Sequence, residues 1–184
     1  MLVPMRAILD AADKNGYAQG AFNVNAVCQV KAAVDVHQIL RSPAIIQGAD
    51  LANGFMGGRT DFANSTLEDK KAGAKNIGAA VKKYAADSDI PVALHLDHGK
   101  NFDSGIAAIE GGYTSVMIDG SSLPFDENVE LTREVVKYAH ERGVTVEGEL
   151  GVLAGVEDHV FAATSTYTNP LSAIDFFKKT GVDA

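Results

Sequence analysis

Short runs of β-forming residues alternate with longer amphipathic segments along the chain, and this alternation constrains the fold more than any other feature. The short runs have the length of strands, and the longer segments have the apolar spacing of helices. A repeated order of strand and helix predicts βα units and a parallel sheet. The predicted strands cover residues 20–25, 43–47, 91–98, 115–119 and 144–150.

The helical segments lie between these strands, with one more before the first strand. They are predicted at residues 5–15, 26–40, 65–86, 102–110, 128–142 and 170–180. Two connections are rich in glycine or irregular in pattern, and we expect long loops there, at residues 48–64 and 155–168. No repeat of fixed period and no linker divides the chain, so the sequence predicts one domain.

The last residues, TGVDA, predict the end of a helix and then the opening of a sixth strand. A (β/α)₈ TIM barrel typically needs about 250 residues. As a barrel, residues 1–184 would form a single partial barrel domain with about the first five βα units and the start of strand six, without the C-terminal third. A doubly wound open sheet is the alternative, but neither GxGxxG nor GxxxxGK[ST] occurs to support a nucleotide-binding version of it.

The composition narrows the classes of function. With 16 basic and 24 acidic residues the chain carries a formal charge of −8, which argues against non-specific nucleic-acid binding. The single cysteine, Cys28, cannot form an intrachain disulfide or a thiolate zinc site. No apolar stretch approaches the roughly 20 residues of a membrane span, and the N-terminus does not resemble a secretory signal. We expect a cytoplasmic protein that does not enter membranes.

Polar side chains occur at the end of every predicted strand. In parallel α/β folds, ligands bind at the carboxyl ends of the strands, so these groups are expected to meet at one edge of the sheet. A polar residue after a strand can also cap the next helix, and this is the main alternative for Asn23 or Gln47 taken singly. The complete set is Asn23, Asn25, Gln47, His95, Asp97, His98, Asp119, Glu147 and Glu149.

The HLDH segment carries the chemistry most directly. Alternation along a strand places His95 and Asp97 on one face, with His98 at the strand's end. A neutral imidazole is a common metal ligand, and a carboxylate beside it can move a proton. We predict His98 as a first ligand, with Glu149 or Asp119 as a second. A catalytic zinc takes three protein ligands, so these residues do not complete the site.

The other histidines are weaker candidates. His37 and His140 lie inside helical patterns and are predicted to be surface residues. His159 lies on the loop after the fifth strand, beside Glu157, and is a minor candidate for the site. No lysine occurs at the end of a predicted strand, which favours a metal over a lysine Schiff base for carbonyl chemistry.

Several motifs together resemble the class II, metal-dependent ketose-bisphosphate aldolases, and within them the fructose-bisphosphate aldolases. The similar segments are GAFNVN at 20–25, PVALHLDHG at 91–99, GGYTSVMIDGS at 111–121, LPFDENVELTREVVKYAH at 123–140, VEGELGVLAGVED at 146–158 and the final TGVDA. The resemblance implies a zinc-dependent, reversible cleavage of fructose 1,6-bisphosphate to dihydroxyacetone phosphate and glyceraldehyde 3-phosphate, in glycolysis and gluconeogenesis.

The resemblance also implies roles for individual residues. Asp97 is similar to the acid/base that acts on the C4 hydroxyl, and Glu157 to the residue that exchanges a proton on the dihydroxyacetone phosphate carbon. His98, Glu149 and Asp119 resemble residues that bind or approach the zinc, and Asp119 resembles one that holds it in an alternative position. We predict that Asn23, which is similar to a substrate-binding asparagine, and Gln47 contact the substrate.

Two departures from the family pattern matter. The family's other zinc histidines, its phosphate loop and a further substrate segment fall beyond residue 184, so we expect the chain alone to be inactive. A homo-oligomer is expected for the complete protein, although the residues themselves do not indicate it. Ala49 stands where many fructose-bisphosphate aldolases carry serine. A tagatose-1,6-bisphosphate aldolase is therefore an alternative, as is a non-catalytic partial barrel that serves as a binding module.

Overall fold

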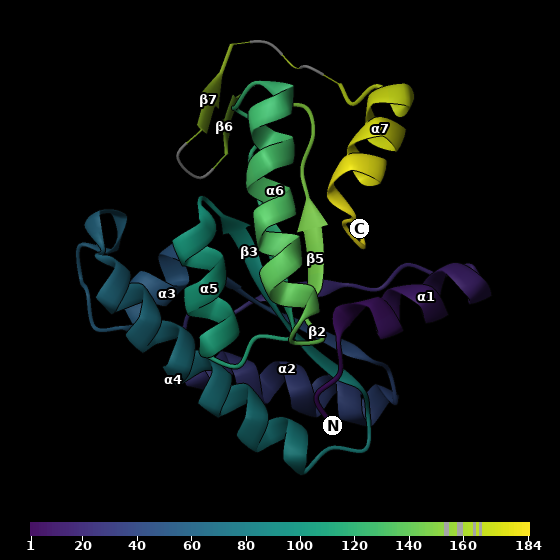
Figure 1. The fold of residues 1–184 in the computed structure, drawn as a ribbon. Helices are drawn as coiled ribbons and strands as arrows, with labels where there is room; N and C mark the ends of the chain where they lie inside the picture. The colour runs from purple at the N-terminus through teal and green to yellow at the C-terminus, as the bar shows by residue number, and fades with distance from the viewer. Residues whose placement is uncertain (153–154, 158–159, 164, 166) are drawn as a thin grey trace.

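Five parallel strands form one sheet in the order β1-β2-β3-β4-β5 (Figure 1). The computed structural model describes residues 1–152, 155–157, 160–163, 165 and 167–184. After the first, each strand of this sheet pairs with the strand that precedes it in sequence. The strands are β1 (Ala21–Asn23), β2 (Ala44–Ala49), β3 (Val92–Gly99), β4 (Ser115–Ile118) and β5 (Thr145–Gly148).

Apart from α3, the helices agree closely with the sequence prediction. They are α1 (Met5–Asn15), α2 (Val27–Leu40), α3 (Asp50–Met56), α4 (Leu67–Ala86), α5 (Phe102–Glu110), α6 (Phe125–His140) and α7 (Pro170–Thr180). Helix α6 begins three residues earlier than predicted because Pro124 occupies its N-cap with a φ of −58°. A proline ring sets φ for helix entry and needs no hydrogen-bond acceptor for a backbone N–H.

Residues 48–64 were predicted as a loop, and this prediction is wrong. The segment contains α3 and a short 3₁₀ helix, η1 (Phe62–Asn64). Helix α3 packs so closely on α4 that a Cβ on Gly73 would lie 1.7 Å from the carbonyl oxygen of Asn53. Because Gly73 belongs to α4, the pattern of residues 48–64 taken alone does not indicate this packing. The second predicted loop contains β6 (Gly155–Glu157) and β7 (Val160–Ala162), which pair antiparallel.

The two faces of the sheet are covered differently. Helices α2, α4, α5, α6 and α7 follow one another along one face of the sheet, each in contact with the next. Helix α1 lies against the other face, where Met5 and Ile8 pack on Ile45 and Ala93. Sequential strand order with the crossover helices on one side is the winding of a barrel, whereas a doubly wound sheet reverses its order and has helices on both faces.

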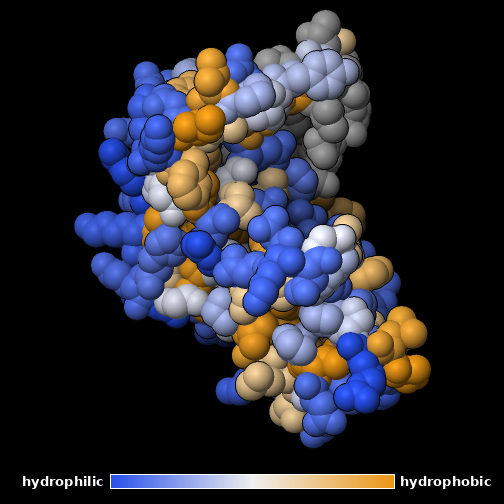
Figure 2. Space-filling view, turned by 90° about the vertical axis from the view of Figure 1, so that its right-hand side faces the viewer, coloured by the Kyte–Doolittle hydropathy of each residue, from blue (hydrophilic) through white to orange (hydrophobic). Residues whose placement is uncertain are grey.

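The chain end continues this winding. Asp183 N donates to Val146 O at 2.8 Å, and Gly148 N donates to Ala184 O at 3.0 Å. Residues 182–184 thus lie beside β5 in the position of the predicted sixth strand. On α7 the side chains of Leu171, Ile174 and Phe177 are 76, 51 and 57% exposed and share one face. Hydrophobic residues are visible at the surface on this side of the molecule (Figure 2).

Across the described part of the chain, no helix is both long and apolar enough to cross a membrane.

A buried tyrosine joins the start of β4 to α3, and its removal should destabilise the fold. Tyr113 Oη donates to Asn53 Oδ1 at 2.7 Å, and both residues are only 2% exposed. We expect Tyr113→Phe to lower the free energy of unfolding by about 1–3 kcal/mol in urea titrations, because a buried acceptor loses its donor. Tyr17→Phe, at an exposed tyrosine, is the control. Equal stability of both variants would contradict this account.

Candidate metal centre and active site

The HLDH segment ends in an irregularity that redirects His98. The register of β3 against β4 shifts between Leu96 and Gly99, and His98 has a φ of +51°. Residues other than glycine rarely adopt this left-handed conformation, which marks a locally strained backbone. A bulge of this kind breaks the alternation of side chains along a strand and re-aims one of them. The ring of His98 consequently faces side chains that follow β4 and β5.

Three predicted metal ligands meet at this point. His98 Nδ1 lies 3.3 Å from Asp119 Oδ2 and 3.6 Å from Glu149 Oε2. One ligand atom from each residue lies within 4.8 Å of the others. Asp119 directly follows β4 and Glu149 directly follows β5, so the carboxyl ends of three adjacent strands supply the group. We call His98, Asp119 and Glu149 the ligand cluster.

Hydrogen bonds hold Asp119 as a charged carboxylate. Its Oδ1 accepts from Ser121 N at 3.1 Å and Ser121 Oγ at 2.6 Å, and its Oδ2 accepts from Lys100 Nζ at 2.7 Å. The hydrogen bond with His98 is the largest cause that lowers the pKa of Asp119 well below its ordinary value, against the opposing effect of burial. The same hydrogen bond, with the charges of Asp97, Glu149 and Asp119, raises the pKa of His98 to about 9.

The donor set suits a divalent metal. One imidazole nitrogen and two carboxylate oxygens are ligands that Zn²⁺ accepts. In this structure the positive charges that face the two carboxylates are the protonated imidazole of His98 and the ammonium of Lys100. A metal ion therefore fits this cluster if His98 gives up its proton.

The charge of Asp97 acts on both the ligand cluster and a second carboxylate, Glu147. The Asp97 side chain is half-buried, and its charge raises the pKa of both His98 and Glu147. In the ladder between β2 and β3 it is the partner of Ala49. The predicted acid/base is thus near the ligand cluster without belonging to it.

His95, on the same face as Asp97, is part of the interior. Its Nδ1 lies 2.8 Å from Ser115 Oγ, and its Nε2 lies 3.5 Å from Glu147 Oε2. Burial is the main cause that lowers the pKa of His95 to about 4, so the ring is neutral near pH 7. Burial also raises the pKa of Glu147. This pair forms a polar layer beneath Asp97.

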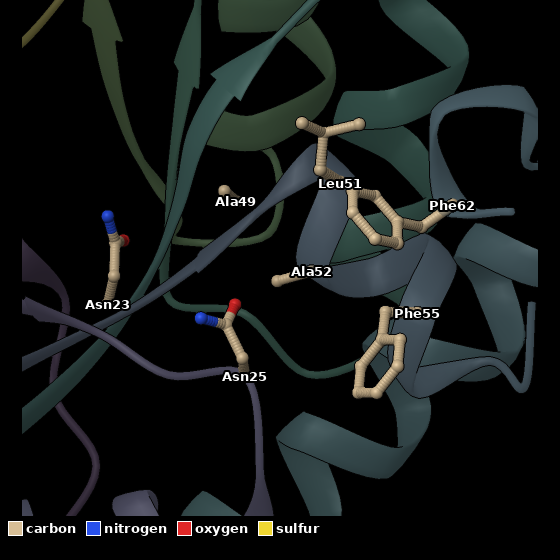
Figure 3. A pocket seen from close by; sticks show the side chains of 7 residues that line it. All are labelled: Asn23, Asn25, Ala49, Leu51, Ala52, Phe55 and Phe62. Atoms are coloured by element: carbon tan, nitrogen blue, oxygen red, sulfur yellow. The ribbon is translucent and has the colours of Figure 1, made fainter. Parts of the chain in front are cut away.

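A pocket of about 440 Å³ opens beside the first two strands (Figure 3). Asn23, Asn25 and Ala49 line one part of it, and the rings of Phe55 and Phe62 line another, edge to face with centroids 6.2 Å apart. Because Asn23 pairs with Gln47 and Ala49 with Asp97, the pocket adjoins the strand that carries Asp97.

The capping alternative for Asn23 and Gln47 is wrong. The N-caps of the helices that follow their strands are Ala26 and Ala49, and neither helix has a side-chain cap. Their contact with a substrate remains a prediction.

The remaining predicted residues have mixed outcomes. His140 is exposed, as predicted. The surface prediction for His37 is wrong, because this side chain is buried and its ring packs against Phe22. Burial lowers the pKa of His37. Glu157 belongs to β6, but its side chain lies outside the described residues, as does all of His159.

Sequence reasoning missed two residues that contact Asp119. Lys100 follows β3 by one residue, so the expectation that no lysine lies at a strand end does not hold for the folded site. Ser121 completes a D-G-S turn in which the aspartate side chain accepts from the backbone two residues on, a pattern the sequence contains. The sequence indicates the role of Lys100 less directly, because its contact with Asp119 depends on the bulge in β3.

Comparison with known proteins gives the family. The sequence profile described as "Fructose-bisphosphate aldolase class-II" matches residues 3–184. The chain belongs to the class II fructose-bisphosphate aldolase family. It is 46% identical to the fructose-bisphosphate aldolase of Treponema pallidum over 187 residues, with 100% of this chain and 52% of the relative covered. Identity to the enzyme of Geobacillus stearothermophilus is 40%, with 99% of this chain and 59% of that relative covered.

Solved structures of the family agree with the fold. The YdjI aldolase of Escherichia coli K12 superposes with a TM-score of 0.76 at 30% identity, over 99% of this chain and 58% of that one. The fructose-bisphosphate aldolase of Campylobacter jejuni superposes with a TM-score of 0.78 at 24% identity, over 98% and 55%, and supports the fold alone. The chain spans about half the length of the curated relatives it matches. It therefore has the strand order and helix positions of about half a TIM barrel.

Metal binding at the ligand cluster should release a proton. The pKa of His98 is raised from 6.5 to about 9 without metal, so the ring is mostly protonated at pH 7.5 and must lose that proton to bind. Affinity for Zn²⁺ should therefore increase as the pH rises toward 9. Calorimetry at pH 7.5 in two buffers with different ionisation enthalpies should give a release of about one proton per Zn²⁺.

His140→Gln, at an exposed histidine, should keep this proton release, whereas His98→Gln should lose most of the binding. An affinity that does not change between pH 6.5 and 9 would contradict the assignment.

Proposed function

We propose that this chain forms the N-terminal part of a zinc-dependent aldolase that reversibly cleaves fructose 1,6-bisphosphate. The observation that carries the proposal is the convergence of Asp97 and the ligand cluster at the carboxyl ends of three neighbouring strands, in a chain that belongs to the class II family. The relatives from Treponema pallidum and Geobacillus stearothermophilus are described as fructose-bisphosphate aldolases, which supports this substrate.

His98 and Glu149 would hold the metal, with Asp119 close enough to ligate it as well. When bound, Zn²⁺ supplies a Lewis acid that stabilises the negative charge of an enediolate. The other ligands would come from outside these residues.

In this proposal residues 1–184 are one partial barrel domain. The exposed apolar face of α7 supports a partial barrel, since such a face needs a covering element.

Asp97 would move the proton in the cleavage step. Its carboxylate takes the proton from the C4 hydroxyl as the C3–C4 bond breaks, and returns it when the bond forms. Glu157 would exchange the proton on the dihydroxyacetone phosphate carbon. Asn23 and Gln47 would orient the sugar, and the pocket beside them has room for part of a small ligand.

The side chain at position 49 bears on the choice of sugar. Ala49 lines the pocket and pairs with Asp97, so it lies where a substrate hydroxyl would approach. Its methyl group cannot donate the hydrogen bond that serine would provide. Tagatose 1,6-bisphosphate, which differs from the fructose ester in the configuration at C4, is therefore the second candidate substrate. We place the complete protein in the cytoplasm as a homo-oligomer, in keeping with the family.

Substitution of Asp97 in the full-length parent should abolish most of the turnover. Asp97→Ala removes the proton carrier but no proposed metal ligand, so kcat should fall by about 10²–10⁴ while zinc content stays unchanged. A coupled assay of triose phosphate production and a metal analysis measure the two quantities. Asp13→Ala, at an exposed aspartate of α1, should retain wild-type values in both. A near wild-type rate for Asp97→Ala would refute the role.

A second test separates the metal route from a lysine Schiff base. Exhaustive chelation should abolish activity of the full-length parent, Zn²⁺ should restore it, and borohydride with substrate should not trap a covalent adduct. Activity that survives chelation, or trapping on Lys100, would overturn the metal mechanism.

The same activity assay with tagatose 1,6-bisphosphate as substrate gives the ratio of kcat/KM for the two sugars. The 184-residue chain alone should be inactive.

A further inference from the structure

Lys100 makes a contact that the proposed reaction does not require. Its ammonium donates to Asp119 Oδ2 at 2.7 Å, and the same oxygen faces His98 Nδ1 at 3.3 Å. The Lys100 side chain is 29% exposed and that of Asp119 is 4% exposed, so the ion pair lies at the edge of the site with its acidic partner buried. In the described part of the chain, no other lysine or arginine pairs with Asp119 or His98.

The two oxygens of Asp119 have different tasks. Oδ1 is held by both the backbone N–H and the hydroxyl of Ser121, at 3.1 and 2.6 Å, which fixes the carboxylate on the turn after β4. Oδ2 is the oxygen that faces His98, another member of the ligand cluster. A metal ion that used Asp119 would therefore use the oxygen that Lys100 already occupies.

We propose that Lys100 competes with the divalent metal for Asp119, so that metal binding to this carboxylate displaces the lysine ammonium. The inference rests on the proposed metal centre. A zinc–carboxylate bond of about 2.0–2.2 Å would bring two cations close together on one oxygen, and their repulsion favours one of them at a time. Lys100 thereby sets the affinity of the cluster and the extent to which Asp119 serves as a ligand.

Zinc affinity in a set of single and double variants tests this competition. The probe is Zn²⁺ alone, measured by competition with a chromogenic chelator at pH 7.5, for the full-length parent protein and its K100M, D119N and D119N/K100M variants. K75M, at an exposed lysine of α4, makes the same change in net charge away from the site and is the matched control. Lys100→Arg keeps the positive charge at the site. Circular dichroism and the thermal midpoint of each variant report whether it folds.

Competition predicts a particular pattern of affinities. K100M should bind Zn²⁺ at least about tenfold more tightly than the wild type, a difference of about 1.4 kcal/mol. The same substitution should have less than about a twofold effect in the D119N background, because the negatively charged carboxylate for which the two cations compete is gone. K75M and Lys100→Arg should stay within about twofold of the wild type.

Other patterns overturn the proposal. Unchanged or weaker binding by K100M removes the competition. If the Lys100 substitution tightens Zn²⁺ binding equally in the wild-type and D119N backgrounds, Lys100 acts by general charge repulsion instead. If neither the wild type nor K100M binds Zn²⁺, the metal centre itself fails, and with it the proposed function. Binding that depends on His98 but not on Lys100 refutes only the present inference.

Chemical labelling measures the displacement directly and without activity. An amine-reactive acetylating reagent, followed by peptide mass spectrometry, should modify Lys100 several-fold faster with Zn²⁺ than without it, because the ammonium leaves Asp119. Lys75 gives the internal reference, and its rate should not change. An equal rate at Lys100 in both conditions would refute the displacement.

Discussion

The parallel ladder of β1 to β5 is the constraint on which the site depends. Each strand pairs with the one before it in sequence, so all five carboxyl ends lie at one edge of the sheet. Register then decides which side chains are neighbours: Asn23 beside Gln47, Ala49 beside Asp97, and Met117 beside Glu147. The crossover helices cover the outer face of the sheet, so the inner face is left to α1 and to the polar residues of the site.

The bulge at the end of β3 turns this regular edge into a chemical site. Strict alternation would place His95 and Asp97 on one face and send His98 to the other. The positive φ of His98 prevents this and turns its ring toward Asp119, which in turn is fixed by Ser121. Such a backbone conformation costs of order 1–3 kcal/mol, which the surrounding contacts must offset. The strain is therefore part of how the cluster is positioned.

Local sequence rules predicted those parts of the structure that depend on nearby residues. The strands, three helices to the residue, and the grouping of polar residues at strand ends all follow from short-range periodicity. The errors involve contacts between distant segments. Helix α3 is held by close packing on Gly73, His37 is buried under Phe22, and Lys100 reaches Asp119 only because β3 bulges. A single sequence without a folded context offers no direct signal for such contacts.

Two positive charges balance the two carboxylates of the ligand cluster. Asp119 and Glu149 place two negative charges around His98, and uncompensated like charges at this distance repel strongly where water is excluded. The proton on His98 and the ammonium of Lys100 supply two positive charges to the same group. A divalent cation carries the same total, so its entry with loss of one proton and one ammonium leaves the local charge unchanged. In the proposed centre the metal would therefore replace two existing cations, and its affinity would be the difference between two compensated states.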